Sequence, residues 1–306
     1  IEDLIQKEEM AVTISHLGYI KRQPITTYRA QRRGGKGKKG MTTHDEDFVE
    51  KIFSASTHDM MLIFTNQGRC HWLKVFEIPE ASRTAKGKPI VSLLKLAKDE
   101  KVAAILPVEA FTDDSSVMFV TKGGTVKKTL LSAYSKPRAG GIIAIKLKDD
   151  ELIQVRLTSK EDDVIISTSE GQAIRFNEGD IREMGRSAAG VRGIALKKQD
   201  DRVVGMDVVE EGKTILTVAS NGYGKRTAPE DYRKQSRGGS GTITLKVTDK
   251  TGTVVSGQQV SEDDDIMIIT NKGKIIRQGV KAISVIGRNT QGVRLVNVDA
   301  GEQVVS

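Results

Sequence analysis

The chain has 306 residues, of which 38% are hydrophobic and 29% charged, so it is long and apolar enough to bury a core. Its 48 Lys and Arg against 40 Asp and Glu give a formal charge of +8, which favours an acidic partner: nucleic acid, an anionic membrane or an acidic protein. The single cysteine, Cys70, excludes an internal disulfide and fits a reducing compartment, and no apolar run approaches the roughly 18 residues of a membrane-spanning helix.

Helical periodicity is weak along the chain except in the first ten residues, IEDLIQKEEM, which resemble neither a signal nor a transit peptide. They begin without methionine, so we expect a fragment of a longer protein. Residues 1–9 are expected to be a linker or terminal segment.

From residue 10 onward one pattern recurs six times: an apolar strand, a small turn ending in glycine, and a short basic strand. The segments read MAVTISHLGYIKR, MMLIFTNQGRCHW, SVMFVTKGGTVKK, VIISTSEGQAIR, TILTVASNGYGKR and IMIITNKGKIIR. Their turn glycines are Gly18, Gly68, Gly124, Gly171, Gly222 and Gly273, at intervals of 50, 56, 47, 51 and 51 residues. Short runs of Val, Ile, Thr and Met bounded by Gly, Asn, Asp and Ser predict hairpins whose turns use glycine at positive φ.

A second signature follows each turn: an arginine, a small or polar stretch rich in glycine, and another apolar strand. The arginines are Arg33, Arg83, Arg138, Arg186, Arg237 and Arg288, which lie 15 residues after the turn glycine in five repeats and 14 in the third. Repeats of about 50 residues with roughly four strands each predict small antiparallel sheets that must stack to bury both faces. Six stacked sheets that close radially form a propeller.

We therefore expect an all-β fold with one closed domain over residues 1–306. The blades are expected at approximately 10–55, 56–108, 109–155, 156–206, 207–258 and 259–306.

Basic residues recur four positions after the turn glycine, which we name the turn-plus-four position. It holds Arg22, Trp72, Lys128, Arg175, Arg226 and Arg277. One interpretation is that exposed strands carry bases for solubility and edge protection; the other is a positive stripe around the disc. Acidic clusters at 45–47, 113–114, 161–163 and 262–265 precede the apolar strands and predict a separate acidic surface. Trp72 interrupts the stripe and is expected to pack in the core or at a blade junction.

The stretch QRRGGKGKKG, residues 31–40, admits three interpretations. As a mononucleotide loop it fails, because Gly40 is followed by Met41 rather than Lys, and neither a strand precedes it nor a helix follows. As a disordered basic arm it would be expected at a terminus. As an elaborated loop between strands, its glycines let the backbone approach a phosphate while Arg and Lys supply charge.

The stretch QRRGGKG resembles the signature box of the carboxy-terminal domain of the DNA gyrase A protein, and the sixfold repeat is similar to the same family over nearly the whole chain. The resemblance implies a six-bladed β-pinwheel, a propeller-like disc of four-stranded antiparallel blades that exchange strands. It also implies that double-stranded DNA wraps around the basic rim in a right-handed sense, so that the complete enzyme introduces negative supercoils with ATP.

The resemblance places residues in two groups. The box comprises Gln31, Arg32, Arg33, Gly34, Gly35, Lys36 and Gly37, and the rim comprises Arg22, Lys38, Lys39, Lys128, Arg175, Arg226 and Arg277. In the family the nucleophilic tyrosine lies in another part of the gyrase A protein, and ATP hydrolysis belongs to the gyrase B protein. We therefore assign no catalytic role to Tyr19, Tyr28, Tyr134, Tyr223 or Tyr232.

The resemblance further implies no cofactor in this domain, since ATP and Mg²⁺ belong to other parts of the enzyme. The implied partners are duplex DNA, the rest of the gyrase A protein, and the gyrase B protein in an A2B2 assembly, with a cytoplasmic, nucleoid-associated location and no membrane. Some relatives end in an acidic regulatory tail, whereas this sequence stops at GEQVVS.

Other functions are favoured less. His16, His44, His58, His71 and Cys70 lack the spacing of metal ligands, so structural roles are expected. The related DNA-binding domain of topoisomerase IV lacks an intact box. A kelch or WD interaction propeller fits poorly with one Trp and repeated bases. A propeller enzyme would need a polar constellation on its axis, and spacing alone shows none.

Overall fold

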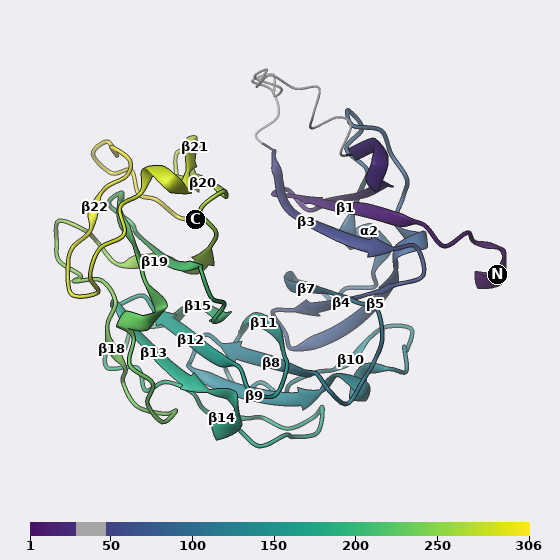
Figure 1. The fold of residues 1–306 in the computed structure, drawn as a ribbon, viewed down its shortest axis with the longest axis horizontal. Helices are drawn as coiled ribbons and strands as arrows, with labels where there is room; N and C mark the ends of the chain where they lie inside the picture. The colour runs from purple at the N-terminus through teal and green to yellow at the C-terminus, as the bar shows by residue number, and fades with distance from the viewer. Residues whose placement is uncertain (29–46) are drawn as a thin grey trace. The chain divides into compact units, whose positions relative to one another are not determined.

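The computed structural model describes residues 1–28 and 47–306, and its regular elements are almost all β-strands (Figure 1). The chain divides into two compact units: unit 1 is Ile1–Thr112 with Ser132–Ala144, and unit 2 is Asp113–Leu131 with Ile145–Ser306. The expected all-β class is confirmed. The single closed domain stays a prediction.

Unit 1 holds two four-stranded antiparallel sheets. Sheet A has the order β3-β1-β2-β6 and sheet B the order β10-β5-β4-β7. The strands of sheet A are β1 (Glu9–Ser15), β2 (Tyr19–Pro24), β3 (Val49–Ser56) and β6 (Lys88–Pro89). Those of sheet B are β4 (Met60–Thr65), β5 (Arg69–Lys74), β7 (Val102–Val108) and β10 (Ile142–Ile143). Short helical turns are η1 (Glu2–Leu4), η2 (Val75–Glu77) and α2 (Ile90–Leu93).

Unit 2 holds three four-stranded sheets, ordered β11-β8-β9-β14 (sheet C), β15-β12-β13-β18 (sheet D) and β19-β16-β17-β22 (sheet E), and a hairpin β20-β21 (sheet F). Sheet C comprises β8 (Ser116–Thr121), β9 (Thr125–Leu130), β11 (Leu152–Thr158) and β14 (Val191–Arg192). Sheet D comprises β12 (Asp163–Thr168), β13 (Gln172–Asn177), β15 (Val203–Val208) and β18 (Thr242–Ile243). Sheet E comprises β16 (Thr214–Ala219), β17 (Tyr223–Thr227), β19 (Val254–Val260) and β22 (Val293–Arg294), and sheet F comprises β20 (Asp265–Ile269) and β21 (Ile275–Gly279).

A one-turn helix follows the second strand of each later hairpin. These helices are η3 (Leu131–Tyr134) after β9, η4 (Glu178–Asp180) after β13, η5 (Pro229–Asp231) after β17 and η6 (Val280–Ala282) after β21. They take the place that η2 has after β5 in unit 1. Each turn redirects the chain toward the neighbouring sheet.

The fourth strand of every four-stranded sheet comes from the following repeat in sequence. We call these two-residue strands donor strands: β6, β10, β14, β18 and β22, which pair with β2, β5, β9, β13 and β17. The residue after each donor strand donates a backbone hydrogen bond to the carbonyl oxygen of the turn glycine in the receiving sheet. The N–O distance is 2.8 Å, as from Ala144 to Gly68 or from Leu295 to Gly222. Neighbouring repeats are thus linked through backbone hydrogen bonds, and the expected strand exchange is present.

Apolar packing between hairpins forms the core. The first hairpin strand is buried along its whole length in β4, β8 and β12, as expected of strands covered on both faces. In unit 2, Met118 and Val120 of β8 share a buried cluster with Val164 and Ile166 of β12. We call the strands that pair with the other edge of the first hairpin strand inner strands; β11, β15 and β19 are those of sheets C, D and E. These three strands lie beside one another.

The sixth repeat differs from the expected four-stranded blade. Sheet F has two strands in the described residues, and a single bridge, Thr270 to Val304, stands where the other sheets have an inner strand. A donor strand comes from the following repeat, and the described residues hold none after the sixth. Five four-stranded sheets and one hairpin therefore replace the six equal sheets that the repeat count predicted.

A glycine at positive φ precedes every donor strand: Gly87, Gly141, Gly190, Gly241 and Gly292. A Cβ atom on any of them would meet a carbonyl oxygen of the receiving strand, as that of Gly241 would meet Ala173. The glycines therefore serve both the turn and the close approach of two backbones.

We expect Gly241→Ala to destabilise the chain more than Gly212→Ala does. Gly212 also has a positive φ, of 79°, but its Cβ would meet nothing within 4 Å. The control should cost about 1 kcal/mol of unfolding free energy for the left-handed backbone, and the collision should add about 1–3 kcal/mol. Urea unfolding measures both, and equal losses would contradict the close approach.

Candidate nucleic-acid interface

The turn-plus-four residues join each repeat to the next. In four sheets the basic side chain at this position donates to a backbone carbonyl beside the one-turn helix of the following repeat: Arg22 Nε to Ile78 (2.7 Å), Lys128 Nζ to Glu178 (3.0 Å), Arg175 Nη1 to Pro229 (2.8 Å) and Arg226 Nε to Ile283 (2.9 Å). Their backbones also form parallel bridges to the following repeat. These contacts make them clamps between repeats.

Burial supports the same role. Lys128 and Arg226 are 6% and 5% exposed, so their charged groups have little access to an external phosphate. Arg22 and Arg175 are half-buried. Each also forms an ion pair: Arg22 Nη1 lies 3.3 Å from Glu80 Oε2, and Arg175 Nη2 lies 2.9 Å from Asp163 Oδ2. The geometry favours the structural interpretation of these four positions over a continuous stripe.

Arg277 is the exception among the predicted rim residues that the structure describes. Its side chain is 71% exposed and pairs with Asp265 on the neighbouring strand. Sheet F receives no donor strand in the described residues, and within them no later repeat covers this arginine. The remaining predicted residues, Gln31, Arg32, Arg33, Gly34, Gly35, Lys36, Gly37, Lys38 and Lys39, lie outside the described residues.

Trp72 holds the same position in sheet B and joins repeats in another way. Its indole Nε1 donates to the carbonyl of Tyr134 at 2.8 Å, and Tyr134 lies in the helical turn of the following repeat. The Tyr134 ring meets Phe64 edge to face with centroids 5.8 Å apart. Trp72 therefore lies at a repeat junction, as expected.

Sequence reasoning missed a second set of bases, one residue earlier than turn-plus-four. Lys21, Lys127 and Lys225 are buried, and their ammonium groups donate to loop carbonyls of the following repeat. Burial lowers the pKa of all three; it lowers that of Lys127 to about 7, helped by the charge of Arg186, and that of Lys225 to about 8, helped by Arg288. Their signal in the sequence is a lysine three residues after the turn glycine in alternate repeats.

The loop arginines of the second signature also bind backbone. Arg237 donates to the carbonyls of Asp180 (3.2 Å) and Arg192 (2.9 Å), and Arg288 to those of Asp231 (2.7 Å) and Ile243 (2.8 Å). Each arginine therefore connects its own loop to the helical turn and the donor strand of the repeat before it. This contact accounts for the loop arginine in the fifth and sixth repeats.

Exposed bases lie on three donor strands. Lys88 of β6, Arg192 of β14 and Arg294 of β22 are exposed, whereas β10 and β18 carry Ile142–Ile143 and Thr242–Ile243. Arg294 lies over the Tyr223 ring at 4.9 Å and donates to its hydroxyl at 2.7 Å. All three side chains are accessible to an external phosphate.

A hollow of about 540 Å³ adjoins β14. Gly123, Gly124 and Gly190 line it together with Arg192. Because glycines expose the backbone, a polyanion could approach closely at this edge of sheet C.

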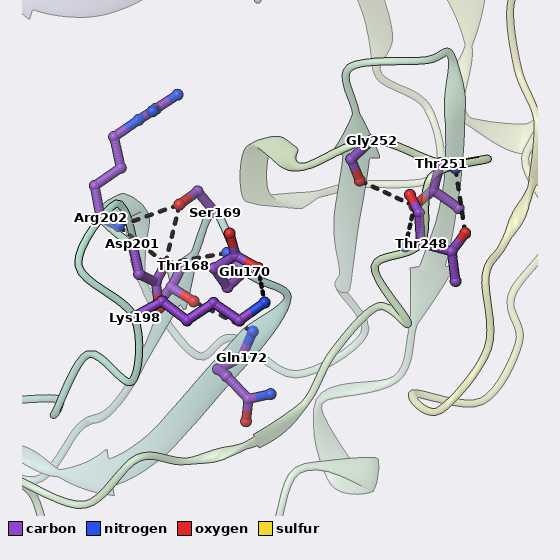
Figure 2. A network of polar contacts seen from close by, with 10 residues as sticks. All are labelled: Thr168, Ser169, Glu170, Gln172, Lys198, Asp201, Arg202, Thr248, Thr251 and Gly252. Carbon is purple, nitrogen blue, oxygen red and sulfur yellow. Dashed lines mark hydrogen bonds and ion pairs between the residues drawn. The ribbon is translucent and has the colours of Figure 1, made fainter.

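Acidic side chains cap the hairpin turns. In sheet D, Asp201 accepts hydrogen bonds from Ser169 Oγ (2.9 Å) and from the amides of Glu170 (3.0 Å) and Arg202 (2.9 Å), while Lys198 pairs with Glu170, as Figure 2 shows. Sheet E replaces the acid with Thr251, whose hydroxyl donates to Thr248 and Gly252. These polar groups stabilise turns and need no ligand to satisfy them.

The acidic clusters at 113–114, 161–163 and 262–265 lie at the entry to β8, β12 and β20. Asp163 is the most engaged: it accepts from Arg175 (2.9 Å), Lys234 (3.0 Å) and Asn177 (3.0 Å). Burial by itself raises the pKa of Asp163, but these hydrogen bonds and the charge of Arg175 outweigh burial and lower it.

The direction of this shift gives a pH-dependent prediction. Because the folded-state pKa lies below the ordinary value of 3.8, the stabilisation is present above pH 3.8 and is lost as the pH falls through the folded-state pKa. Asp163→Asn should therefore lower the unfolding free energy at pH 7 by about 2 kcal/mol, with the difference shrinking in acid. Denaturant unfolding from pH 7 to pH 3 measures it, and a difference independent of pH would contradict the assignment.

The described residues contain no group of three or more His, Cys, Asp or Glu side chains placed to hold a metal ion. Buried Cys70 precedes His71, whose Nε2 lies 3.9 Å from Glu100. Burial lowers the pKa of His71.

Along the inner strands of unit 2, Arg156 Nη2 lies 3.2 Å from Asp207 Oδ1 in an ion pair, and Asp207 accepts a hydrogen bond of 2.8 Å from the backbone amide of Gln259.

Within the described part of the chain, no helix is both long and apolar enough to cross a membrane.

Comparison with known proteins matches a family model described as "DNA gyrase C-terminal domain, beta-propeller". It matches six times, at residues 9–56, 59–109, 115–159, 162–210, 213–261 and 264–306. The chain is 50% identical over 306 residues to the DNA gyrase A protein of Salmonella typhimurium and 47% identical over 309 residues to that of Staphylococcus aureus. It is covered completely in both alignments but spans only 35% of either relative.

Two solved structures are also similar. A C-terminal domain of DNA topoisomerase IV gives a TM-score of 0.85 at 25% identity, with 99% of this chain and 93% of that chain covered. A DNA gyrase A C-terminal domain gives a TM-score of 0.73 at 28% identity, with 98% of both chains covered. The backbone similarity extends to both proteins, whereas the relatives at 47–50% identity are gyrase A proteins.

Proposed function

Because the chain belongs to the family of DNA gyrase C-terminal domains, we propose that it binds double-stranded DNA without sequence specificity and wraps it in a right-handed sense around a basic rim of six blades. The observation that carries the proposal is the set of exposed bases on the donor strands of sheets A, C and E: Lys88, Arg192 and Arg294. Arg192 and Arg294 lie at the same register, opposite the residue after the turn glycine, whereas Lys88 lies one residue earlier in its strand. Bases that recur on the donor strands of alternate repeats suit a ligand whose charges repeat along its length, as phosphates do on a duplex.

The free energy needed to bend DNA is consistent with many weak phosphate contacts. Bending a duplex by 40–90° over 20–30 base pairs costs about 1–6 kcal/mol, which phosphate contacts distributed along the wrap must offset. Phosphate contacts carry no sequence information. Binding is therefore sequence-tolerant, with a preference for sequences that bend readily.

Residues fall into three proposed roles. The box, Gln31 to Gly37, with Lys38 and Lys39, fastens one end of the wrap. Lys88, Arg192, Arg294 and Arg277 contact phosphates along the rim. Arg22, Lys128, Arg175 and Arg226, the other predicted rim residues, act as clamps that hold successive repeats in place beneath that surface.

The whole protein is proposed to be a gyrase A protein that joins the gyrase B protein in an A2B2 enzyme and introduces negative supercoils with ATP. The relatives of which this chain spans 35% are DNA gyrase A proteins, which supports that assignment. ATP and Mg²⁺ are proposed to bind elsewhere in the enzyme, and the location is proposed to be the cytoplasm at the nucleoid.

The corresponding protein of topoisomerase IV is the second candidate, because the solved topoisomerase IV domain has the higher TM-score, 0.85 against 0.73. The intact sequence QRRGGKG favours gyrase, since the topoisomerase IV domain is expected to lack it. The two candidates differ in whether the domain wraps DNA strongly enough to change topology.

Ligation of nicked plasmid circles in the presence of the 306-residue chain tests the proposal. Right-handed wrapping leaves a positive linking-number shift that grows with the ratio of protein to DNA. Circles whose linking number does not change, at a protein concentration that saturates binding, would overturn wrapping. Absence of duplex binding would overturn the whole proposal.

A further inference from the structure

The junctions between repeats alternate between two kinds. Where the receiving sheet has a lysine three residues after its turn glycine, the donor strand carries an exposed base: Lys21 with Lys88, Lys127 with Arg192, and Lys225 with Arg294. In sheets B and D that position holds His71 and Ile174, and the donor strands are Ile142–Ile143 and Thr242–Ile243. A buried lysine and a basic donor strand therefore occur together in all three four-stranded sheets that have either.

Each buried ammonium gathers oxygens from the loop that leads into that donor strand. Lys225 Nζ donates to the carbonyls of Gly287 (2.9 Å), Arg288 and Thr290 (3.2 Å), and to the Thr290 hydroxyl (2.9 Å). Lys21 does the same in unit 1, with Ser82 (3.0 Å), Arg83 (2.9 Å) and Ala85 (2.9 Å).

Lys127 contacts the corresponding loop in sheet C. Its Nζ donates to the carbonyl of Arg186 and lies 5.2 Å from the centre of the Phe119 ring. Three loops thus each accept at least one hydrogen bond from a buried ammonium group, and each leads within a few residues to an exposed base.

Sheet D shows that a donor strand can pair with a sheet that lacks the buried lysine. Ile174 is fully buried at the same position. The loop of the following repeat is supported instead by Tyr232, which is buried beside Ile165 and Ala173 and hydrogen-bonds Thr244 through its hydroxyl at 2.5 Å. Sheet B has Tyr134 at the corresponding place. An apolar side chain at the lysine position is therefore compatible with the fold.

The lysines also come at an electrostatic cost. Burial and a nearby arginine, Arg186 for Lys127 and Arg288 for Lys225, lower the pKa of both amines. Buried cations near other cations are unfavourable. If stability were the only requirement, an apolar residue at the lysine position with a buried tyrosine, as in sheet D, would give the more stable junction. The lysines nevertheless stand next to the basic donor strands.

We infer that Lys21, Lys127 and Lys225 are positioning residues of the DNA-binding surface: each holds the loop of the following repeat so that the base on its donor strand points to the phosphates. The inference rests on the proposed function. These lysines do not touch DNA themselves, because they are 9%, 0% and 0% exposed. They act through Lys88, Arg192 and Arg294.

The test is the double variant Lys127→Met and Lys225→Met, which keeps the stems but removes both ammonium groups. Ile174→Met is the matched control, with the same new residue at the same position of sheet D. Duplex affinity, its salt dependence, the thermal midpoint and the rate of tryptic cleavage after Arg186 and Arg288 are measured on the 306-residue chain.

We expect the double variant to bind duplex DNA about tenfold more weakly, because the charge-assisted contacts that hold two of the loops are gone. The slope of log K against log salt should become shallower by up to about 0.9 for each phosphate that is no longer neutralised, a change that loss of stability alone would not cause. The loops should be cleaved faster, while the control behaves like the unaltered chain.

Unchanged affinity, slope and cleavage in the double variant would overturn the inference, and so would an affinity loss that only tracks the unfolded fraction. Failure of the unaltered chain to bind duplex DNA would overturn the proposed function and this inference with it. Tight binding by both chains would overturn the inference alone.

Discussion

Replacing Glu178 by alanine is expected to lower the free energy of unfolding by about 3–5 kcal/mol, the usual cost of leaving a buried charge without its partner. Glu178 is fully buried in η4. Its carboxylate accepts hydrogen bonds from Thr158 Oγ1 (2.9 Å) and from the Asp162 amide (3.1 Å), and it lies 3.8 Å from Lys128 Nζ. Removing it leaves the ammonium group of Lys128 uncompensated in the interior.

Denaturant unfolding measures this loss, and a double-mutant cycle identifies its cause. Adding Lys128→Met to Glu178→Ala should recover part of the stability, because the unpaired cation is removed as well. Glu178→Gln should cost less than Glu178→Ala, since an amide oxygen can still accept from Thr158. A double variant as unstable as the sum of the singles would show that the pair is not coupled.

The triple variant Arg32→Ala, Arg33→Ala and Lys36→Ala is expected to abolish most of the linking-number shift in nicked-circle ligation. In the proposed mechanism these residues fasten one end of the wrap, so their loss lets the bent duplex straighten and recover its bending energy, about 1–6 kcal/mol. Residual duplex binding should persist through the bases on the donor strands.

Lys95→Ala, Lys98→Ala and Lys101→Ala together form the matched control, since the charge change is the same and all three lysines are exposed in unit 1. This variant should retain most of the shift. An undiminished shift in the box variant would remove the box from the mechanism, and an equal loss in both variants would reduce its role to net charge.

The recurrence of glycine was the most reliable guide to the fold. All six turn glycines adopt a positive φ, as the hairpin pattern predicted, because the conformation is a local property that one residue type satisfies. An apolar strand was expected after each loop arginine, and the donor strands lie there, but each has only two residues, as in Lys88–Pro89. Their pairing depends on the neighbouring repeat rather than on their own sequence.

The turn-plus-four bases show where periodicity misleads. A clamp that joins each repeat to the next recurs as regularly as a surface stripe does, so spacing alone could not separate Arg226, which is buried, from Arg277, which is exposed. The lysines one residue earlier were missed because they occur in alternate repeats, where Ile174 and Ile276 interrupt the series. Long basic side chains bury their stems and find backbone acceptors that no sequence pattern shows.

The salt dependence of duplex affinity tests most directly whether the basic donor strands grip the phosphates. For the variant Lys88→Gln, Arg192→Gln and Arg294→Gln, we predict a slope of log K against log salt that is shallower by about 0.9 for each phosphate left without its base, or up to about 2.7 in total. A slope equal to that of the unaltered chain, measured with both proteins fully folded, would show that these bases do not contact phosphates.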